Sequence, residues 1–263
     1  MPSCHSVTCR AEQALARLAC VALCLTLVAC GAPAPRPGEG FGTWGGRPIG
    51  QAPAPNPGLK QAMIQRATRE WEHFDRQVVV FKGTEESIPH VGAWEDDYTH
   101  VSRVNLYWRA VNKPALDGLD CRQPWSAAFI SWVMQSAGVP TSQFRPAIAH
   151  WVYLSTMVEE ASYPGRYFVP RRIQDYSPRP GDLVCAPRGR MPVRPVDGYT
   201  SAWMLQGAET HCDLVVGKSG QTLEVIGGNV RNSVSKSILE LDARGRLKPV
   251  PRRPWFLVME NRL

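Results

Sequence analysis

The residues best placed to do chemistry lie in one stretch of the chain, residues 121–138. Pro124 suits the first turn of a helix, and Gly138 suits the position just past its end. Ser126 falls in that first turn, where unpaired backbone N–H groups and the positive end of the helix dipole favour a developing negative charge. A nucleophilic hydroxyl on a helix would be placed there, although a serine at this position is more often only an N-terminal cap.

Two further polar residues lie on a predicted β-hairpin formed by residues 211–216 and 221–229. A turn centred on residues 218–219 would bring His211 opposite about Ile226. Asn229 would then lie near the same end of the sheet, within reach of His211 after a small shift in register. Asp213 follows His211 by two residues, so its side chain should point to the same face of the strand.

Helices and strands are predicted around these residues from the spacing of apolar side chains. His150 lies in one of the helices, where a lone histidine is more often a packed structural residue, although it could line a cleft. Residues 187–206 are rich in arginine and proline and are predicted to form an inserted loop. The predicted helices are residues 59–74, 102–111, 124–137 and 148–154, and the predicted strands are residues 77–81, 183–186, 211–216, 221–229, 232–241 and 255–260.

The N-terminus is predicted to be a signal peptide, residues 1–30. Arg10 and Arg17 precede an apolar run, residues 18–29, that is too short to span a bilayer. The run ends in Leu-Val-Ala-Cys-Gly, which resembles a bacterial lipobox with Cys30 as the lipidated residue. The alternative is an ordinary cleaved signal peptide in which Cys30 is incidental. By the same resemblance, Gly31 after the cysteine favours the outer membrane, so we expect a lipid-anchored protein on the periplasmic side of the cell envelope.

Residues 31–58 are rich in proline, glycine and alanine and should form a flexible tether. Residues 59–263 are then expected to form one domain with an N-terminal helical extension. The net charge of +7 comes from scattered arginines, which argues against a nucleic-acid partner and suits attraction to anionic envelope polymers. We expect a monomer.

Three phrases carry a resemblance to a known superfamily. They are the helix phrase at residues 124–133, Gly-Asp-Leu-Val at residues 181–184, and Ile-Gly-Gly-Asn-Val at residues 226–230. Residues 102–263 resemble the NlpC-type and CHAP-type branches of the papain-like superfamily, and most closely an uncharacterised bacterial lipoprotein family, a domain of unknown function, within that group. The resemblance implies an α+β fold with helices packed on a small antiparallel sheet, and cleavage of amide bonds in peptidoglycan.

The resemblance also assigns roles to individual residues. Ser126 stands where the superfamily has its nucleophilic cysteine, and a serine hydroxyl needs a base to take its proton. His211 would be that base and Asn229 would orient its imidazole, with Asp213 as a source of negative charge. Backbone N–H groups at the start of the helix, supported by Gln123 and Trp125, would form the oxyanion hole.

Three cysteines remain after residue 30, namely Cys121, Cys185 and Cys212. In the implied fold the strands that carry Cys185 and Cys212 are neighbours, so a disulfide between them is the first pairing to expect. Cys121 could instead pair with one of them or act as a thiol. A zinc site built from these cysteines and His211 is not favoured, because the tight Cys-x-x-Cys spacing is absent. No metal or cofactor is expected.

Two functions from different classes follow. The first is a peptidoglycan amidase or endopeptidase that hydrolyses an amide bond in stem peptides through a Ser-His-Asn site. The second is a catalytically inactive lipoprotein that binds peptidoglycan or a partner on the same fold. An acyl or lipid hydrolase that uses the same serine and histidine is a third class.

Overall fold

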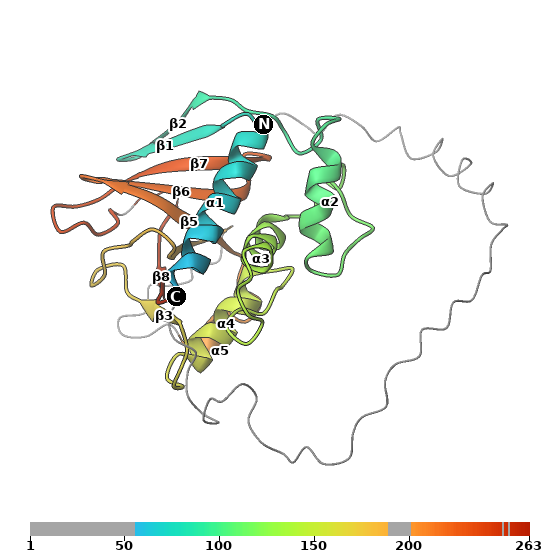
Figure 1. Cartoon of the computed structure of the whole chain (residues 1–263). Helices are drawn as coiled ribbons and strands as arrows, with labels where there is room; N and C mark the ends of the chain where they lie inside the picture. Colours follow the sequence, from blue (N-terminus) through green and yellow to red (C-terminus); the bar gives the residue numbers. More distant parts are fainter. Residues whose placement is uncertain (1–55, 189–200, 249, 252) are drawn as a thin grey trace, which may run out of the picture. The chain divides into compact units, whose positions relative to one another are not determined.

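An eight-stranded mixed β-sheet with helices packed on it forms the body of the protein in the computed structural model (Figure 1). The structure describes residues 56–188 and 201–263 except 249 and 252, which belong to one compact unit, Ala52–Leu263. The predicted signal peptide, Cys30 and residues 31–55 of the tether lie outside the described residues. Within the described part of the chain, no helix is long and apolar enough to cross a membrane.

The order of strands in the sheet is β2-β1-β7-β6-β5-β4-β8-β3. All strand pairs are antiparallel except β1 and β7, which are parallel. The predicted α+β class is therefore confirmed, but the sheet is larger than expected and it is mixed. The strands are β1 (Val78–Lys82), β2 (Glu85–His90), β3 (Phe168–Arg171), β4 (Leu183–Pro187), β5 (Thr210–Ser219), β6 (Thr222–Val230), β7 (Ser233–Glu240) and β8 (Leu257–Asn261).

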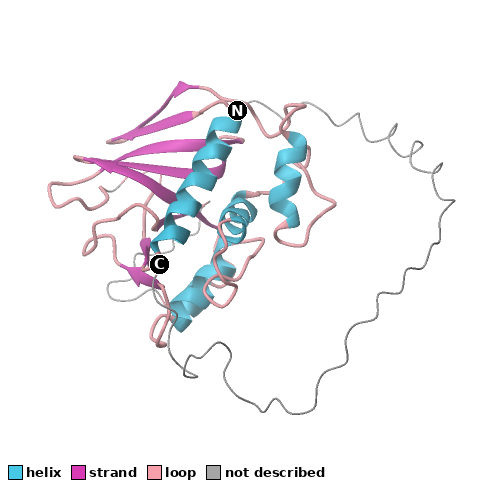
Figure 2. Cartoon of the chain, viewed as in Figure 1, coloured by secondary structure: helices cyan, strands magenta, loops and turns pink. Residues whose placement is uncertain are grey.

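Five helices occur among the described residues (Figure 2). Three of them, α1, α3 and α4, contact the strands at the middle and the β3 side of the sheet. The predicted helix 59–74 begins two residues earlier than expected, because the Asn56 side chain accepts a hydrogen bond from Gly58 N–H and caps it. The helices are α1 (Pro57–His73), α2 (Val101–Arg109), α3 (Ser126–Ser136), α4 (His150–Glu160) and α5 (Ala202–Leu205).

The central strands are buried on both faces of the sheet. Neighbouring residues of a strand point to opposite faces, so they belong to two different apolar clusters. Leu214 and Ile226 belong to the core between the sheet and the helices. Val215 and Val225 belong to a second apolar cluster on the other face. This double burial explains the continuous apolar runs of the central strands, which are typical of strands that are covered on both sides.

The central helix α3 begins at Ser126, two residues later than predicted. Pro124 lies outside the helix and Trp125 is its N-terminal flanking residue. Gly138 follows the helix with a φ of +86°, the left-handed conformation that the sequence predicts for it. Ser126 is thus the first residue of α3, and its backbone N–H group precedes the first intrahelical hydrogen bond, from Phe129 N–H to Trp125 O.

The hairpin of β5 and β6 is the predicted one, but its register is not. Leu214, not His211, lies opposite Ile226. The turn lies at residues 220–221, two residues later than predicted, where Gly220 has a φ of +55°. An irregularity between Val215 and Gly217 moves the pairing back by one residue, so the register differs from the predicted one by three. If the register at Leu214 is continued by three residues, His211 lies across from Asn229.

Other elements also differ from the sequence prediction. Strands β2 and β3 were not predicted; β2 is mostly polar and lies exposed at one edge of the sheet. Strand β8 pairs with both β4 and β3 and so lies inside the sheet. The predicted loop 187–206 contains helix α5, and residues 189–200 lie outside the described part.

A disulfide joins Cys185 of β4 to Cys212 of β5, which are direct partners in the ladder. Their Cα atoms are 4.2 Å apart, and both residues are fully buried. The bond fixes β5 to β4 one residue beyond His211, so it restrains the strand that carries this histidine.

Candidate active site

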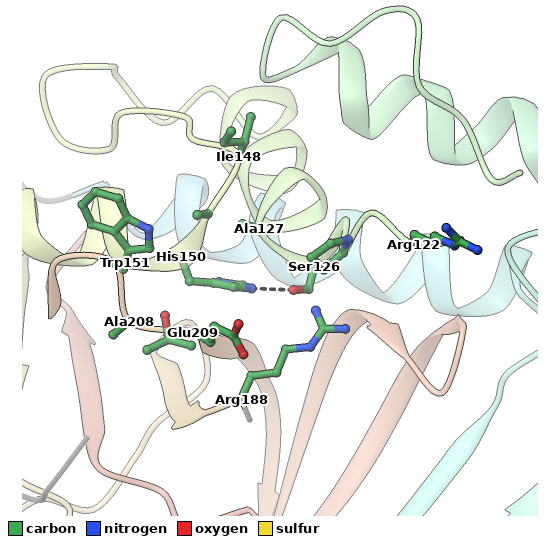
Figure 3. A pocket seen from close by; sticks show the side chains of 13 residues that line it. Arg122, Ser126, Ala127, Ile148, His150, Trp151, Arg188, Ala208 and Glu209 are labelled. Carbon is green, nitrogen blue, oxygen red and sulfur yellow. Dashed lines mark hydrogen bonds between the residues drawn. The ribbon is translucent and has the colours of Figure 1, made fainter. Parts of the chain in front are cut away.

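A pocket of about 420 Å³ opens where the first residues of α3 and α4 meet the end of β4 and the start of β5 (Figure 3). Ser126 and His150 form one wall of it. Three charged residues, Arg122, Arg188 and Glu209, also line it. The pocket cannot be predicted from the order of these elements in the sequence. It forms because the first residues of the two helices pack against the strands.

The central contact of the pocket is a hydrogen bond of 2.7 Å between Ser126 Oγ and His150 Nε2 (Figure 3). Each residue is the first of its helix. The two side chains are only 2% and 3% exposed, respectively. A hydroxyl on a helix N-terminus and an imidazole within hydrogen-bond reach are the parts of an activated serine nucleophile.

The other ring nitrogen of His150, Nδ1, forms a short hydrogen bond with the hydroxyl of Tyr153, one helical turn further along α4. Both partners of the ring are hydroxyl groups, which can donate or accept, so either neutral tautomer satisfies the hydrogen bonds of the imidazole. Burial lowers the pKa of His150 well below its usual value, and the neighbouring His211 lowers it further. His150 is therefore neutral near pH 7.

A second chain of polar contacts lies behind this pair, on β5. His211 Nε2 is 2.7 Å from Asp213 Oδ1. The other carboxylate oxygen accepts a hydrogen bond of 2.9 Å from Arg253. The rings of His211 and His150 have their centroids 5.4 Å apart, so the two histidines are neighbours although they come from different elements.

The charges of His211, Asp213 and Arg253 can be assigned from their contacts. Burial alone would raise the pKa of Asp213, but the charge of Arg253, the hydrogen bond from His211 and, at low pH where His211 is protonated, the charge of His211 hold it below its usual value. Because the carboxylate is ionised and can only accept, His211 Nε2 carries a proton. Burial lowers the pKa of His211 despite the opposing attraction of Asp213, so His211 is neutral with its Nδ1 unprotonated.

Asn229, the predicted third member of the catalytic set, has other partners. Its Nδ2 donates a hydrogen bond of 2.7 Å to Glu95 Oε2, and its Oδ1 accepts one of 3.4 Å from Arg188. The φ of Asn229 is +56°, an unusual conformation that asparagine tolerates better than most residues. The side chain that accepts a hydrogen bond from His211 is Asp213, which the sequence proposes as a supporting charge.

Trp125 and Gln123, the predicted oxyanion supports, point to different surroundings. Trp125 is buried and its indole N–H donates a short hydrogen bond to Glu95. Burial raises the pKa of Glu95 above its usual value. Gln123 is exposed and lines a second pocket. Neither side chain is therefore placed as an oxyanion donor. The remaining candidate donors near Ser126 in the sequence are the backbone N–H groups at the start of α3.

Two glycines of β6 allow this close packing. A Cβ atom on Gly227 would lie 1.8 Å from Asp213 Oδ1, and one on Gly228 would lie 2.5 Å from atoms of both Trp125 and Phe129. Because only hydrogen atoms fit in these positions, β6 can approach both the Asp213 carboxylate and the start of α3. The Ile-Gly-Gly-Asn phrase thus has a packing role that holds the site together.

A second pocket of about 640 Å³ adjoins the first. The two pockets share Pro124, Ile148 and Ala149 as lining residues. Ile148 is 50% exposed and stands on the wall between them. The second pocket thus lies next to the one that contains Ser126.

Of the predicted residues, the structure gathers Ser126, His211 and Asp213 around His150. Sequence reasoning missed the hydrogen bond between Ser126 and His150, and it gave no role to Tyr153. One signal was present: His150 and Tyr153 are three residues apart in a predicted helix, a spacing that places both side chains on one face.

Comparison with known proteins gives one match. A family model described as "uncharacterized protein conserved in bacteria (DUF2272)" matches residues 95–261, which is more than half of the chain and includes every residue of the pocket. No curated protein and no solved structure matches the chain.

Proposed function

The chain belongs to this family of uncharacterized bacterial proteins, and we propose that it is a serine hydrolase that cleaves an amide bond, with Ser126 as the nucleophile and His150 as the base. The observation that carries the proposal is the hydrogen bond of 2.7 Å between Ser126 Oγ and His150 Nε2 inside a pocket. A serine is a poor nucleophile unless a base in this position takes its proton.

The reaction follows from the contacts. In the productive tautomer, His150 Nε2 accepts a hydrogen bond from the Ser126 hydroxyl, and His150 Nδ1–H donates a hydrogen bond to the Tyr153 hydroxyl. As Ser126 Oγ attacks the substrate carbonyl carbon, its proton passes to Nε2, and the carbonyl oxygen takes up the negative charge. That oxygen would be stabilised by backbone N–H groups at the start of α3, where the helix dipole is also favourable.

The remaining steps use the same residues. The protonated His150 gives its proton to the leaving amine, which breaks the amide bond and leaves an acyl group on Ser126. A water molecule then attacks the acyl group, with His150 as its base, and Ser126 is released. The ionised Asp213 favours the protonated state of His150, so it stabilises the imidazolium in both steps.

His211 has a supporting role in this proposal. The sequence predicted it as the base, and its neutral state leaves Nδ1 able to accept a proton. However, the hydrogen bond of Ser126 goes to His150, and His211 is bonded to Asp213. We assign His211 to the support of the Asp213 carboxylate, which it holds beside His150. Direct proton transfer from Ser126 to His211 stays a prediction, and the variants below separate the two histidines.

The substrate and the location are also proposals. We propose a papain-like fold of the NlpC and CHAP type, anchored to the outer membrane by a lipid on Cys30, with peptidoglycan stem peptides as the substrate. The helix that begins with a nucleophile, the adjoining β5–β6 hairpin and the two adjoining pockets support this assignment. A monomer on a tether that starts at residue 31 and ends where α1 begins at Pro57 would reach the cell wall from the membrane.

A binding protein without turnover is the second candidate. The small exposed fractions of Ser126 and His150, 2% and 3%, favour it, because a buried serine and histidine with satisfied hydrogen bonds can simply stabilise the fold. In that case Ser126→Ala would lower stability but leave the affinity for peptidoglycan unchanged.

The direct test is covalent labelling with a fluorophosphonate probe, which reacts with activated serine hydroxyls. We expect labelling of the native protein, no labelling of Ser126→Ala, and a loss of at least tenfold in the labelling rate for His150→Gln. Release of new amino groups from peptidoglycan sacculi should follow the same order. Absence of labelling in the folded native protein would exclude the enzyme and leave the binding protein. Labelling that survives in His150→Gln but is lost in His211→Gln would make His211 the base.

The role of Tyr153 has a matched control. Tyr153→Phe removes the acceptor for Nδ1–H, so the buried imidazole should shift to the other tautomer, whose Nε2 is already protonated. A buried donor without a partner costs about 1–3 kcal/mol, so we expect kcat to fall about 10- to 100-fold. Tyr167 is also buried, and its hydroxyl has no hydrogen-bond partner among the described residues. Tyr167→Phe should therefore keep the native kcat, and equal rates for both variants would remove Tyr153 from the mechanism.

A further inference from the structure

Two arginines of the pocket, Arg122 and Arg188, have no carboxylate partner within the described part of the chain. Both line the pocket that contains Ser126 and His150. The described ion pairs use other arginines, and the one side-chain hydrogen bond of Arg188 is a long one of 3.4 Å to the uncharged Asn229. In Figure 3 the guanidinium group of Arg188 points toward the Ser126–His150 hydrogen bond.

The electrostatic balance of the pocket is positive. Arg122 and Arg188 contribute two positive charges, and Glu209 contributes one negative charge, while His150 is neutral. Arg188 is exposed where it lines the pocket, and the carboxylates of Glu209 and Glu95 attract its charge from a distance. An exposed guanidinium without an ion-pair partner among the described residues is available to bind an anion.

We propose that Arg188 binds a free carboxylate of the substrate, next to the amide bond that Ser126 attacks, and that Arg122, which lines the same pocket, adds positive charge. A guanidinium presents two parallel N–H groups that match the two oxygens of a carboxylate. This inference rests on the proposed function and narrows it: the substrate is a peptide with a carboxylate close to the scissile bond. The Arg188–Asn229 contact holds the side chain in position, which gives Asn229 a positioning role.

The test compares two synthetic peptides that are identical except that one ends in a free carboxylate and the other in a carboxamide. Binding is measured by calorimetry with Ser126→Ala protein, so that turnover is not needed. We expect the carboxylate peptide to bind about 10- to 100-fold more tightly, since a hydrogen bond to a charged group is worth more than a neutral one. In Arg188→Gln this preference should fall to near one, and Arg188→Lys should restore part of it.

A matched control is Arg69→Gln, which removes an exposed arginine of α1 that is not part of the pocket. This variant should keep the full preference for the carboxylate peptide. Equal binding of the two peptides, or a preference that Arg188→Gln does not change, would overturn the inference. Hydrolysis by the native protein is scored separately: binding preference without any hydrolysis would refute the proposed function and leave the carboxylate site intact.

Discussion

The pH dependence of stability offers a sharp test of the state of His150. Burial places the pKa of His150 in the folded protein well below its usual value of 6.5. The unfolded chain, which exposes the ring, therefore takes up a proton at a higher pH than the folded protein does. The stability that the neutral His150 contributes is thus complete above about pH 7 and is lost as the pH falls below 6.5.

The size of this loss can be worked out. A histidine that stays neutral when folded and titrates with a pKa near 6.5 when unfolded costs the protein about 1.4 kcal/mol between pH 7.5 and pH 5.5. His211 adds a loss of the same sign, because burial lowers its pKa as well. The titratable groups that face His150 are His211, Asp213 and Arg188, and none of the three is removed when His150 alone is replaced.

The assay is urea unfolding followed by tryptophan fluorescence, at pH 7.5, 6.5 and 5.5, for the native protein and for His150→Gln. The variant will be less stable at every pH because it loses the hydrogen bonds of the ring, so the informative quantity is the difference between the two proteins. We expect this difference to shrink by about 1.4 kcal/mol as the pH falls from 7.5 to 5.5. A difference that stays constant over this range would refute a neutral, buried His150, and with it the proposed base.

Three further predictions concern the surroundings of the site. Gly228→Ala should lower the free energy of unfolding by about 1–3 kcal/mol or more, because its Cβ would overlap the start of α3; Gly217→Ala, whose Cβ would meet only a flexible side chain at 3.4 Å, should be nearly neutral in the same urea titration. Replacing both Cys185 and Cys212 with alanine should cost about 3.5 kcal/mol, as estimated from the 27-residue separation that the disulfide closes, and an unchanged denaturation midpoint would contradict this. Asp213→Asn should cost about 3–5 kcal/mol, since it leaves a partly buried arginine without its partner; a loss below 1 kcal/mol would show that this ion pair is not important for stability.

The sequence predicts most of the elements around the site, because their patterns are local. The end of α3, the strand from Leu183 and the presence of the β5–β6 hairpin follow from apolar spacing and glycine positions, whereas α3 begins two residues later than Pro124 predicts. The register of the hairpin does not follow from these patterns, since the turn lies at residues 220–221 and not at 218–219, and the irregularity between Val215 and Gly217 offsets only one residue of that difference. Strand β2 was missed for a similar reason: it is an exposed edge strand, and an edge strand needs no apolar face.

The site shows the same division between local and distant information. His150 and Tyr153 share one face of a helix, so their spacing of three residues is enough to predict their contact. The contact of His150 with Ser126 is different, because it joins the first residues of two helices that are 24 residues apart in the chain. What brings them together is the burial of α3 and α4 against the same sheet, and that packing depends on residues as distant as Gly228. From the sequence alone, a single histidine in a helix is therefore interpreted as a structural residue. Its possible role as a base can be inferred only from the folded structure, in which α3 places Ser126 beside it.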